Sequence, residues 1–167
     1  GQTPWGTYLT CEENFNGYFG SDGQPTLDGR ATRYGLAAKD GGAGWHKFDE
    51  RFDLARHPHE ANRFGWVVEI DPRDPASTPK KRTALGRFKH ESATVTLAAD
   101  KRVVVYSGDD EANEFLYRFV SDKAYAGDDN LLDNGTLYVA QFDDNGMRWL
   151  PLVFGEGKLA PENGFHS

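Results

Sequence analysis

Short runs of apolar and β-branched residues, each closed by a turn signal, constrain the fold of this chain most strongly. The clearest run covers residues 93–107, where Ala93, Val95 and Leu97 alternate with threonines, Ala99-Asp100 turns the chain, and a Val-rich run follows. Alternation in two runs joined by a tight turn is typical of a β-hairpin. A second hairpin is predicted over residues 135–154, with its turn at 143–146.

Four further runs predict strands at residues 5–12, 64–71, 83–90 and 115–120. Antiparallel strands in chain order occur in sandwiches, barrels and propellers. Long polar loops between the hairpins and acidic clusters at the strand ends favour the propeller. We therefore expect an all-β, mainly antiparallel fold that is part of a β-propeller, with blades of meander strands and long loops.

Residues 20–62 lack a clear period and are rich in Gly, Asp and Pro. Short helical turns are expected at 46–53 and 57–62. Loops of this length within a domain are usually functional or inserted segments. The 167 residues are enough for one domain. We expect one partial β-propeller domain over 1–167, with a long loop or insertion at 20–62.

Composition excludes several classes of protein. The chain has 19 Lys and Arg against 26 Asp and Glu, a net charge of −7, which argues against nucleic-acid binding. No apolar run approaches the ~20 residues of a membrane span, and no signal peptide opens the chain. The single cysteine excludes an internal disulfide framework. Motifs of Ser hydrolases, P-loop enzymes and CxxC proteins do not occur.

Acidic residues gather at the ends of the predicted strands, at 12–13, 90–91, 109–111 and 143–144. Carboxylate oxygens suit hard cations such as Ca²⁺. The pair at 143–144 precedes Asn-Gly and is best interpreted as a hairpin turn. For 109–111, a metal site and a solvated turn are equally open on the sequence alone.

Cys11 stands directly before two glutamates. Their charges would raise the pKa of its thiol, which disfavours a catalytic nucleophile. A buried inert thiol and a metal-bound thiolate both remain open. His90 could bind a metal or form a hydrogen bond in a turn. His57 and His59 flank a proline, where a solvated loop is favoured over a metal site.

Several motifs in their order along the chain carry a family resemblance. Trp-Gly-Thr-Tyr-Leu-Thr-Cys-Glu-Glu-Asn at 5–14 is the most specific, and Leu-Gly-Arg-Phe-Lys-His-Glu-Ser-Ala at 85–93 and Val-Val-Tyr-Ser-Gly-Asp-Asp-Glu at 104–111 follow. Weaker matches lie at 33–35, 65–72, 115–121 and 159–165. With these motifs the chain resembles the PhoX family of bacterial alkaline phosphatases over nearly its whole length.

The resemblance implies an exported phosphomonoesterase built on a six-bladed β-propeller with extra elements. It implies a site of ferric iron and calcium ions, ligated by a cysteine and carboxylates, that acts on small phosphate esters in the periplasm or outside the cell. By the same resemblance Cys11 would bind iron and Glu91 would bridge metals, and Asp110, with Asp109, would bind calcium. Further metal-ligand candidates by resemblance are Glu12, Glu13 and Glu111.

The chain departs from the family pattern in its length. Family members are much longer, and their Asp-Arg-Pro-Glu segment, expected to carry a phosphate-binding arginine, is absent. The chain therefore resembles an N-proximal fragment of the propeller with some of the ligands, and no catalytic or substrate-binding residue is predicted. An arc of a propeller leaves strand edges exposed, which predicts self-association.

These observations favour a metal-dependent phosphomonoester hydrolase that is incomplete in this chain. The alternative is a calcium-stabilised β-propeller module that binds a partner through residues 20–62 without catalytic activity. Calcium without iron, together with a freely alkylated Cys11, would favour that alternative. A third hypothesis is a calcium-dependent hydrolase of another ester, such as a lactone, which substrate profiling would separate from a phosphatase.

Overall fold

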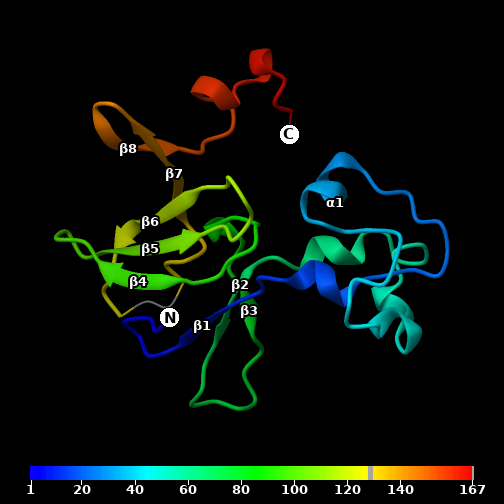
Figure 1. Ribbon diagram of the computed structural model, residues 1–167. Helices are drawn as coiled ribbons and strands as arrows, with labels where there is room; N and C mark the ends of the chain where they lie inside the picture. Colours follow the sequence, from blue (N-terminus) through cyan, green and yellow to red (C-terminus); the bar gives the residue numbers. More distant parts are fainter. Residues whose placement is uncertain (128–129, 167) are drawn as a thin grey trace.

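The computed structural model describes residues 1–127 and 130–166, and these residues form two antiparallel sheets with few helices (Figure 1). The smaller sheet has the order β1 (Tyr8–Cys11), β2 (Val67–Ile70) and β3 (Lys80–Lys81). The larger sheet contains five strands in chain order: β4 (Thr94–Leu97), β5 (Arg102–Gly108), β6 (Leu116–Ala124), β7 (Gly135–Asp143) and β8 (Gly146–Pro151). The prediction of an all-β, mainly antiparallel chain is confirmed.

Both predicted hairpins are present. In the first, the partners run from Thr94 and Tyr106 to Leu97 and Val103. The second joins β7 to β8 through Asp143, whose carboxylate accepts a hydrogen bond from the Asn145 amide at 2.9 Å. The acidic pair at 143–144 therefore lies in a hairpin turn.

The strand predicted at 83–90 is wrong. Thr83–Leu85 forms the 3₁₀ helix η5, and Gly86 follows with a φ of +89°, a conformation that favours glycine. The chain then curls back, so that the His90 ring bonds the Gly86 carbonyl at 2.9 Å. The positive φ of Gly86 and this hydrogen bond within the segment override a local sequence that favours β-structure.

Residues 14–64 fold around aromatic side chains and form a separate lobe, on the right in Figure 1. The lobe contains α1 (Gly29–Arg33) and the 3₁₀ helices η1 (Phe15–Tyr18), η2 (Trp45–Lys47), η3 (Glu50–Phe52) and η4 (Glu60–Arg63). Helical turns therefore occur near 46–53 and 57–62, as predicted. Its buried core residues are Phe15, Phe19, Leu36, Leu54, Ala61 and Phe64.

Two further 3₁₀ helices, η6 (Gly157–Leu159) and η7 (Pro161–Asn163), follow β8.

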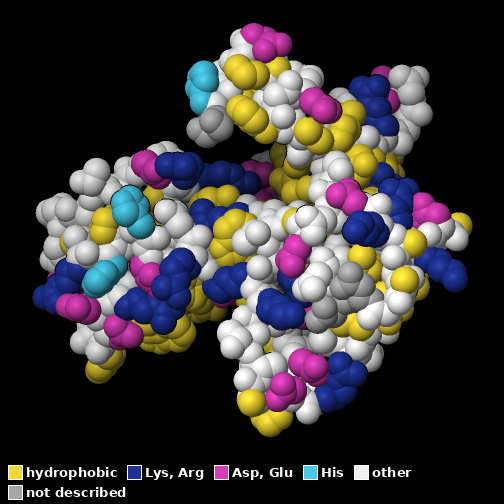
Figure 2. All heavy atoms as spheres, turned by 180° about the vertical axis from the view of Figure 1, so that it is seen from behind, with side chains coloured by type: hydrophobic (Ala, Val, Ile, Leu, Met, Phe, Trp, Pro, Cys, Tyr) yellow, Lys and Arg dark blue, Asp and Glu magenta, His cyan; other side chains and the backbone are white. Residues whose placement is uncertain are grey.

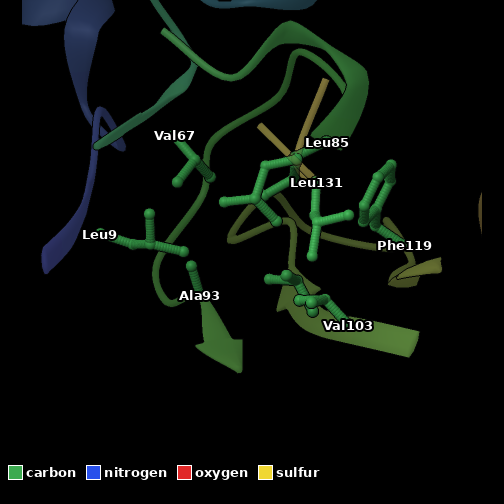
Figure 3. Close-up of a cluster of buried hydrophobic side chains, with 9 residues drawn as sticks. Leu9, Val67, Leu85, Ala93, Val103, Phe119 and Leu131 are labelled. Carbon is green, nitrogen blue, oxygen red and sulfur yellow. The ribbon is translucent and has the colours of Figure 1, made fainter. Parts of the chain in front are cut away.

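A second core joins the two sheets. Figure 3 shows side chains from both sheets pointing toward one another, among them Leu9 of β1, Val67 of β2 and Phe119 of β6. Each is almost fully buried, and burial of such a side chain stabilises the fold by roughly 1.5–3 kcal/mol. The remaining buried members of this core are Leu85, Ala93, Val103, Val105, Leu131 and Leu132. The core therefore fixes β1 against the larger sheet.

A buried ion pair strengthens the same junction. The Glu69 carboxylate accepts hydrogen bonds from Trp5 Nε1 at 2.6 Å, from the Thr7 hydroxyl, and from Arg82 Nε at 2.6 Å. The side chains of Glu69 and Arg82 are only 4% and 2% exposed. Arg82 also binds Asp133 at 2.6 Å. The segment that leads into β1 is thus tied to β2 and to the residues after β3.

Arg87 joins the aromatic lobe to the sheets. Its guanidinium donates to the carbonyls of Phe64 and Ala61, both at 2.8 Å, and lies 4.3 Å from the centre of the Tyr34 ring. The Tyr34 hydroxyl in turn donates to the Arg87 carbonyl at 2.8 Å. The two lobes therefore share a junction of directed hydrogen bonds.

Acidic and basic side chains are interspersed on the face seen in Figure 2. Several large apolar side chains are exposed near the C-terminal end of the chain, including Phe142, Met147 and Phe154. None of the helices in the described residues has the length and apolar character needed to cross a membrane.

Candidate metal centre

Cys11 is the last residue of β1 and pairs with Val67 of β2. Its side chain is half-buried, and it lines a hollow of about 300 Å³ between the end of β1 and the segment before β4. Glu91 and Ser92 line the same hollow. The fold therefore brings Cys11 and Glu91, which lie far apart in the sequence, to one place.

Glu13 links this pair to Asp110. Partial burial raises the pKa of Glu13, and a hydrogen bond with Asp110, the charge of Asp110 and the charge of Glu91 raise it further. Burial also raises the pKa of the Cys11 thiol, with a further contribution from the charge of Glu13. These four side chains therefore influence one another, and we call them the Glu13 cluster: Cys11, Glu13, Glu91 and Asp110.

Backbone pairing explains how Glu91 and Asp110 come together. His90 forms an antiparallel bridge with Asp109 beyond the end of β5. The Asp110 amide donates to the Lys89 carbonyl at 3.0 Å. The turn that carries Glu91 is thus paired with the loop that carries Asp110, and both lie at the end of β1.

Glu12 points away from the Glu13 cluster, as alternation along an extended chain requires. Its carboxylate binds Lys81 Nζ at 2.8 Å and accepts a hydrogen bond from the Trp66 amide at 3.2 Å.

Asp109 and Glu111 also have cationic partners. The buried Asp109 carboxylate binds Arg33 at 3.1 Å, and Arg33 binds Glu114 at 2.9 Å as well. Glu111 forms an ion pair with Lys89. Glu12, Asp109 and Glu111 therefore lie outside the Glu13 cluster, and their roles as metal ligands stay predictions.

Sequence reasoning missed Arg33 and Lys89, the cations that hold the acidic loop. No signal in the sequence pairs Arg33 of α1 with Asp109, because the contact depends on how the aromatic lobe packs. His57 lies 3.7 Å from Glu50 in that lobe, and His59 is exposed there, remote from the Glu13 cluster by chain position and packing.

His90 is fully buried and hydrogen-bonded to the Ser107 hydroxyl at 2.8 Å and to the Gly86 carbonyl at 2.9 Å. Burial lowers the pKa of His90 to about 4, so the ring is neutral at neutral pH. Of the two interpretations open from the sequence, the structure supports hydrogen bonding within a turn.

Among residues 1–127 and 130–166, no group of three or more His, Cys, Asp and Glu side chains is arranged to hold one metal ion. The donor types of the Glu13 cluster nevertheless fit cations. Thiolate sulfur suits iron, and carboxylate oxygens suit calcium, which takes about 6–8 oxygen ligands. The mutual repulsion that raises the pKa of Glu13 is also what a bound cation would relieve. The cluster thus fits part of a metal site.

The sequence model described as Alkaline phosphatase PhoX matches residues 1–167. The chain belongs to the PhoX family. A structure of Pseudomonas fluorescens PhoX, in complex with vanadate as a transition state analogue, superposes with a TM-score of 0.91 at 51% sequence identity. The match covers 98% of this chain and 31% of that PhoX chain. A search of curated proteins gives no match.

Proposed function

We propose that the whole protein is an alkaline phosphatase, a metal-dependent phosphomonoester hydrolase, and that residues 1–167 supply part of its metal site. The observation that carries the proposal is the convergence of Cys11, Glu13, Glu91 and Asp110 from three distant segments. Membership of the PhoX family and the similarity to a PhoX that binds vanadate support it.

The proposed metals are ferric iron and calcium. Cys11 would hold iron through its thiolate, and Glu91, Asp110 and Glu13 would offer carboxylate oxygens to the metal ions. Glu12, Asp109 and Glu111 would join the metal shell only by giving up Lys81, Arg33 and Lys89.

Bound metal ions polarise the phosphoryl group and activate an oxygen nucleophile, so that no covalent intermediate on a serine is required. The residues of this chain prepare the site for the ions. In the metal-free folded protein, Glu13 and Cys11 hold their protons to higher pH than in the unfolded chain, because their pKa values are raised. Metal binding must therefore displace these protons, and metal affinity rises with pH.

Hydrolysis of p-nitrophenyl phosphate by the whole protein tests the proposal. We expect turnover to fall to background on chelation and in Glu91→Gln, which keeps the shape of the side chain and removes its charge. Glu50→Gln is the matched control, since Glu50 is an exposed, ion-paired carboxylate of the aromatic lobe. Turnover that survives both chelation and Cys11→Ala would exclude this mechanism.

We also propose that residues 1–167 are part of a β-propeller domain, with residues 20–62 as an insertion. The sheet β4–β8 is an antiparallel meander, the connectivity of the four-stranded blades of propellers, with one strand more. An open apolar groove of about 510 Å³ on β6–β8, lined among others by Phe115, Tyr117 and Phe142, supports further sheets in the whole protein. Light scattering should show the isolated segment self-associating and the whole protein monodisperse.

The proposed location is the periplasm or the exterior of the cell, by resemblance to exported PhoX enzymes. Fractionation of the producing cells tests it, because a cytoplasmic protein would stay with the soluble fraction after release of the periplasm.

A second candidate is a calcium-stabilised module without catalysis. The ion pairs of Glu12, Asp109 and Glu111 favour a structural role for these carboxylates. This candidate predicts bound calcium without iron, a Cys11 thiol open to alkylation in the purified protein, and no hydrolysis of phosphate esters. Elemental analysis of the whole protein separates the two candidates.

A further inference from the structure

One buried hydroxyl holds both neighbours of Glu91. Ser107 of β5 is 5% exposed, and its Oγ lies 2.8 Å from Nδ1 of His90. The same Oγ lies 2.6 Å from the Ser92 carbonyl oxygen. Because the neutral His90 ring carries its proton on Nε2, toward the Gly86 carbonyl, the one hydroxyl proton of Ser107 is shared between Nδ1 and the Ser92 oxygen. Residues 90 and 92, on either side of Glu91, therefore both lie within hydrogen-bonding distance of a single atom of β5.

The His90 ring is immobilised on its other sides. Its Nε2 bonds the Gly86 carbonyl at 2.9 Å, and its ring stacks on Phe88 with 3.6 Å between centroids. Phe88 stacks in turn on Tyr117 of β6 at 4.3 Å. A ring held on this many sides has one orientation available, so its bond to Ser107 is geometrically defined.

Besides Ser107, the bridge of His90 to Asp109 and the bond of the Asp110 amide to the Lys89 carbonyl hold the backbone that leads to Glu91. Glu91 itself makes few contacts. Its amide lies 3.5 Å from the Gly108 carbonyl, a long hydrogen bond, and its side chain is exposed at the hollow beside Cys11. Because the side chain itself is free, its direction depends on the backbone at residues 90–92. The Ser107 hydroxyl holds that backbone through its contacts with His90 and Ser92.

We propose that His90 and Ser107 are positioning residues that hold the Glu91 carboxylate toward Cys11 and so set the affinity of the site for metal. The proposal rests on the proposed function, in which Glu91 is a metal ligand. Neither His90 nor Ser107 is exposed enough to contact substrate, so both act through Glu91. Loss of a residue that orients a metal ligand typically weakens metal affinity by roughly 10–100-fold.

Ser107→Ala in the whole protein is the test, with Ser121→Ala as its matched control. Ser121 of β6 is equally buried and also forms two hydrogen bonds, accepting from the Val103 amide at 2.9 Å and donating to the Lys123 carbonyl at 2.7 Å. Both variants should lower the unfolding midpoint to a similar extent. Calorimetric titration with Ca²⁺ and measurement of retained iron should show a loss of roughly 10–100-fold in affinity for Ser107→Ala only.

A pair of substitutions at His90 gives an independent readout. Asparagine places its amide near the position of Nδ1, whereas glutamine places it near that of Nε2. His90→Asn should therefore keep the bond to Ser107 and retain more metal than His90→Gln, which would keep only the bond to Gly86. A purely structural role would not produce this order at equal unfolding midpoints.

The outcomes are separable. If the unmodified protein binds neither Ca²⁺ nor iron, the proposed function fails, and the positioning role falls with it. If it binds metal and loses it in Glu91→Gln, while Ser107→Ala binds as tightly as Ser121→Ala, only the positioning role is overturned. The same conclusion follows if His90→Gln retains as much metal as His90→Asn.

Discussion

The buried pair of Glu69 and Arg82 offers the sharpest test of how the fold holds β1 and, through it, Cys11. We consider Glu69→Gln, which preserves the shape of the side chain and removes its charge. The Arg82 side chain is 2% exposed, so its guanidinium cannot turn to solvent for compensation. Asp133, whose side chain is 48% exposed, remains as its partner.

The expected cost follows from this geometry. Breaking a buried ion pair costs roughly 3–5 kcal/mol, and the surviving contact with Asp133 places Glu69→Gln at the lower end, about 3 kcal/mol. For a chain of this size each kcal/mol lowers the melting temperature by roughly 2–4 °C, so we expect a fall of roughly 6–12 °C. Urea unfolding followed by circular dichroism measures the same change as a lower midpoint.

Glu50→Gln provides the control, because the side chains of Glu50 and Arg56 are 63% and 64% exposed. An exposed pair of this kind contributes about 0.2–1 kcal/mol, and high salt screens it. We expect the cost of Glu69→Gln to persist in 1 M salt, where the Debye length is about 3 Å. Equal costs for the two variants would refute the reasoning, since burial would then make no difference to the pair.

Three further predictions concern the acidic region. Because burial raises the pKa of Cys11 above its ordinary value of 9.0, the pH profile of its alkylation by iodoacetamide in the metal-free protein should have its midpoint above that of a cysteine peptide. A midpoint at the peptide value would contradict the burial argument. The pKa of Glu13 is raised above its ordinary 4.5, so the folded state holds the Glu13 proton more tightly than the unfolded chain does. The metal-free protein should therefore lose stability as the pH rises from 4.5 through the raised pKa. Glu13→Gln should remove this pH dependence of the unfolding free energy in urea titrations. Arg33→Leu leaves the buried Asp109 carboxylate without its cation and should cost about 1–3 kcal/mol, whereas Arg30→Leu on the same helix, with a side chain 88% exposed, should change thermal stability by about 0.5 kcal/mol at most.

The hairpins were predictable because alternation and turn residues are local signals. Residues 93–107 carry both, and the structure pairs Thr94 with Tyr106 as that pattern requires. The strand prediction for 83–90 was wrong because Gly86 and the buried His90 ring hold these β-forming residues in a curl. Ser107 of β5 also holds the His90 ring, and no local pattern reveals that contact.

The candidate site was predictable in its residue types and only partly in its geometry. Both glutamates after Cys11 were candidates from the sequence, and the structure gives Glu12 an ion pair with Lys81, whereas Glu13 lies beside Asp110. The partner of Asp109 could not be predicted, since Arg33 reaches it only through the packing of the aromatic lobe. The structure of residues 14–64 likewise depends on side-chain contacts that follow no regular sequence period, such as that between Phe19 and Phe64.

The Arg87 junction has a consequence for anyone who shortens the molecule. Deleting residues 20–62 as if they were a dispensable surface loop would take away the Ala61 carbonyl and the Tyr34 ring that this guanidinium binds. Of these partners the guanidinium would keep only the Phe64 carbonyl, beside the turn that leads to Glu91. A trimmed version is therefore expected to lose stability and to aggregate, and minimal versions of this protein should be designed with the aromatic lobe intact.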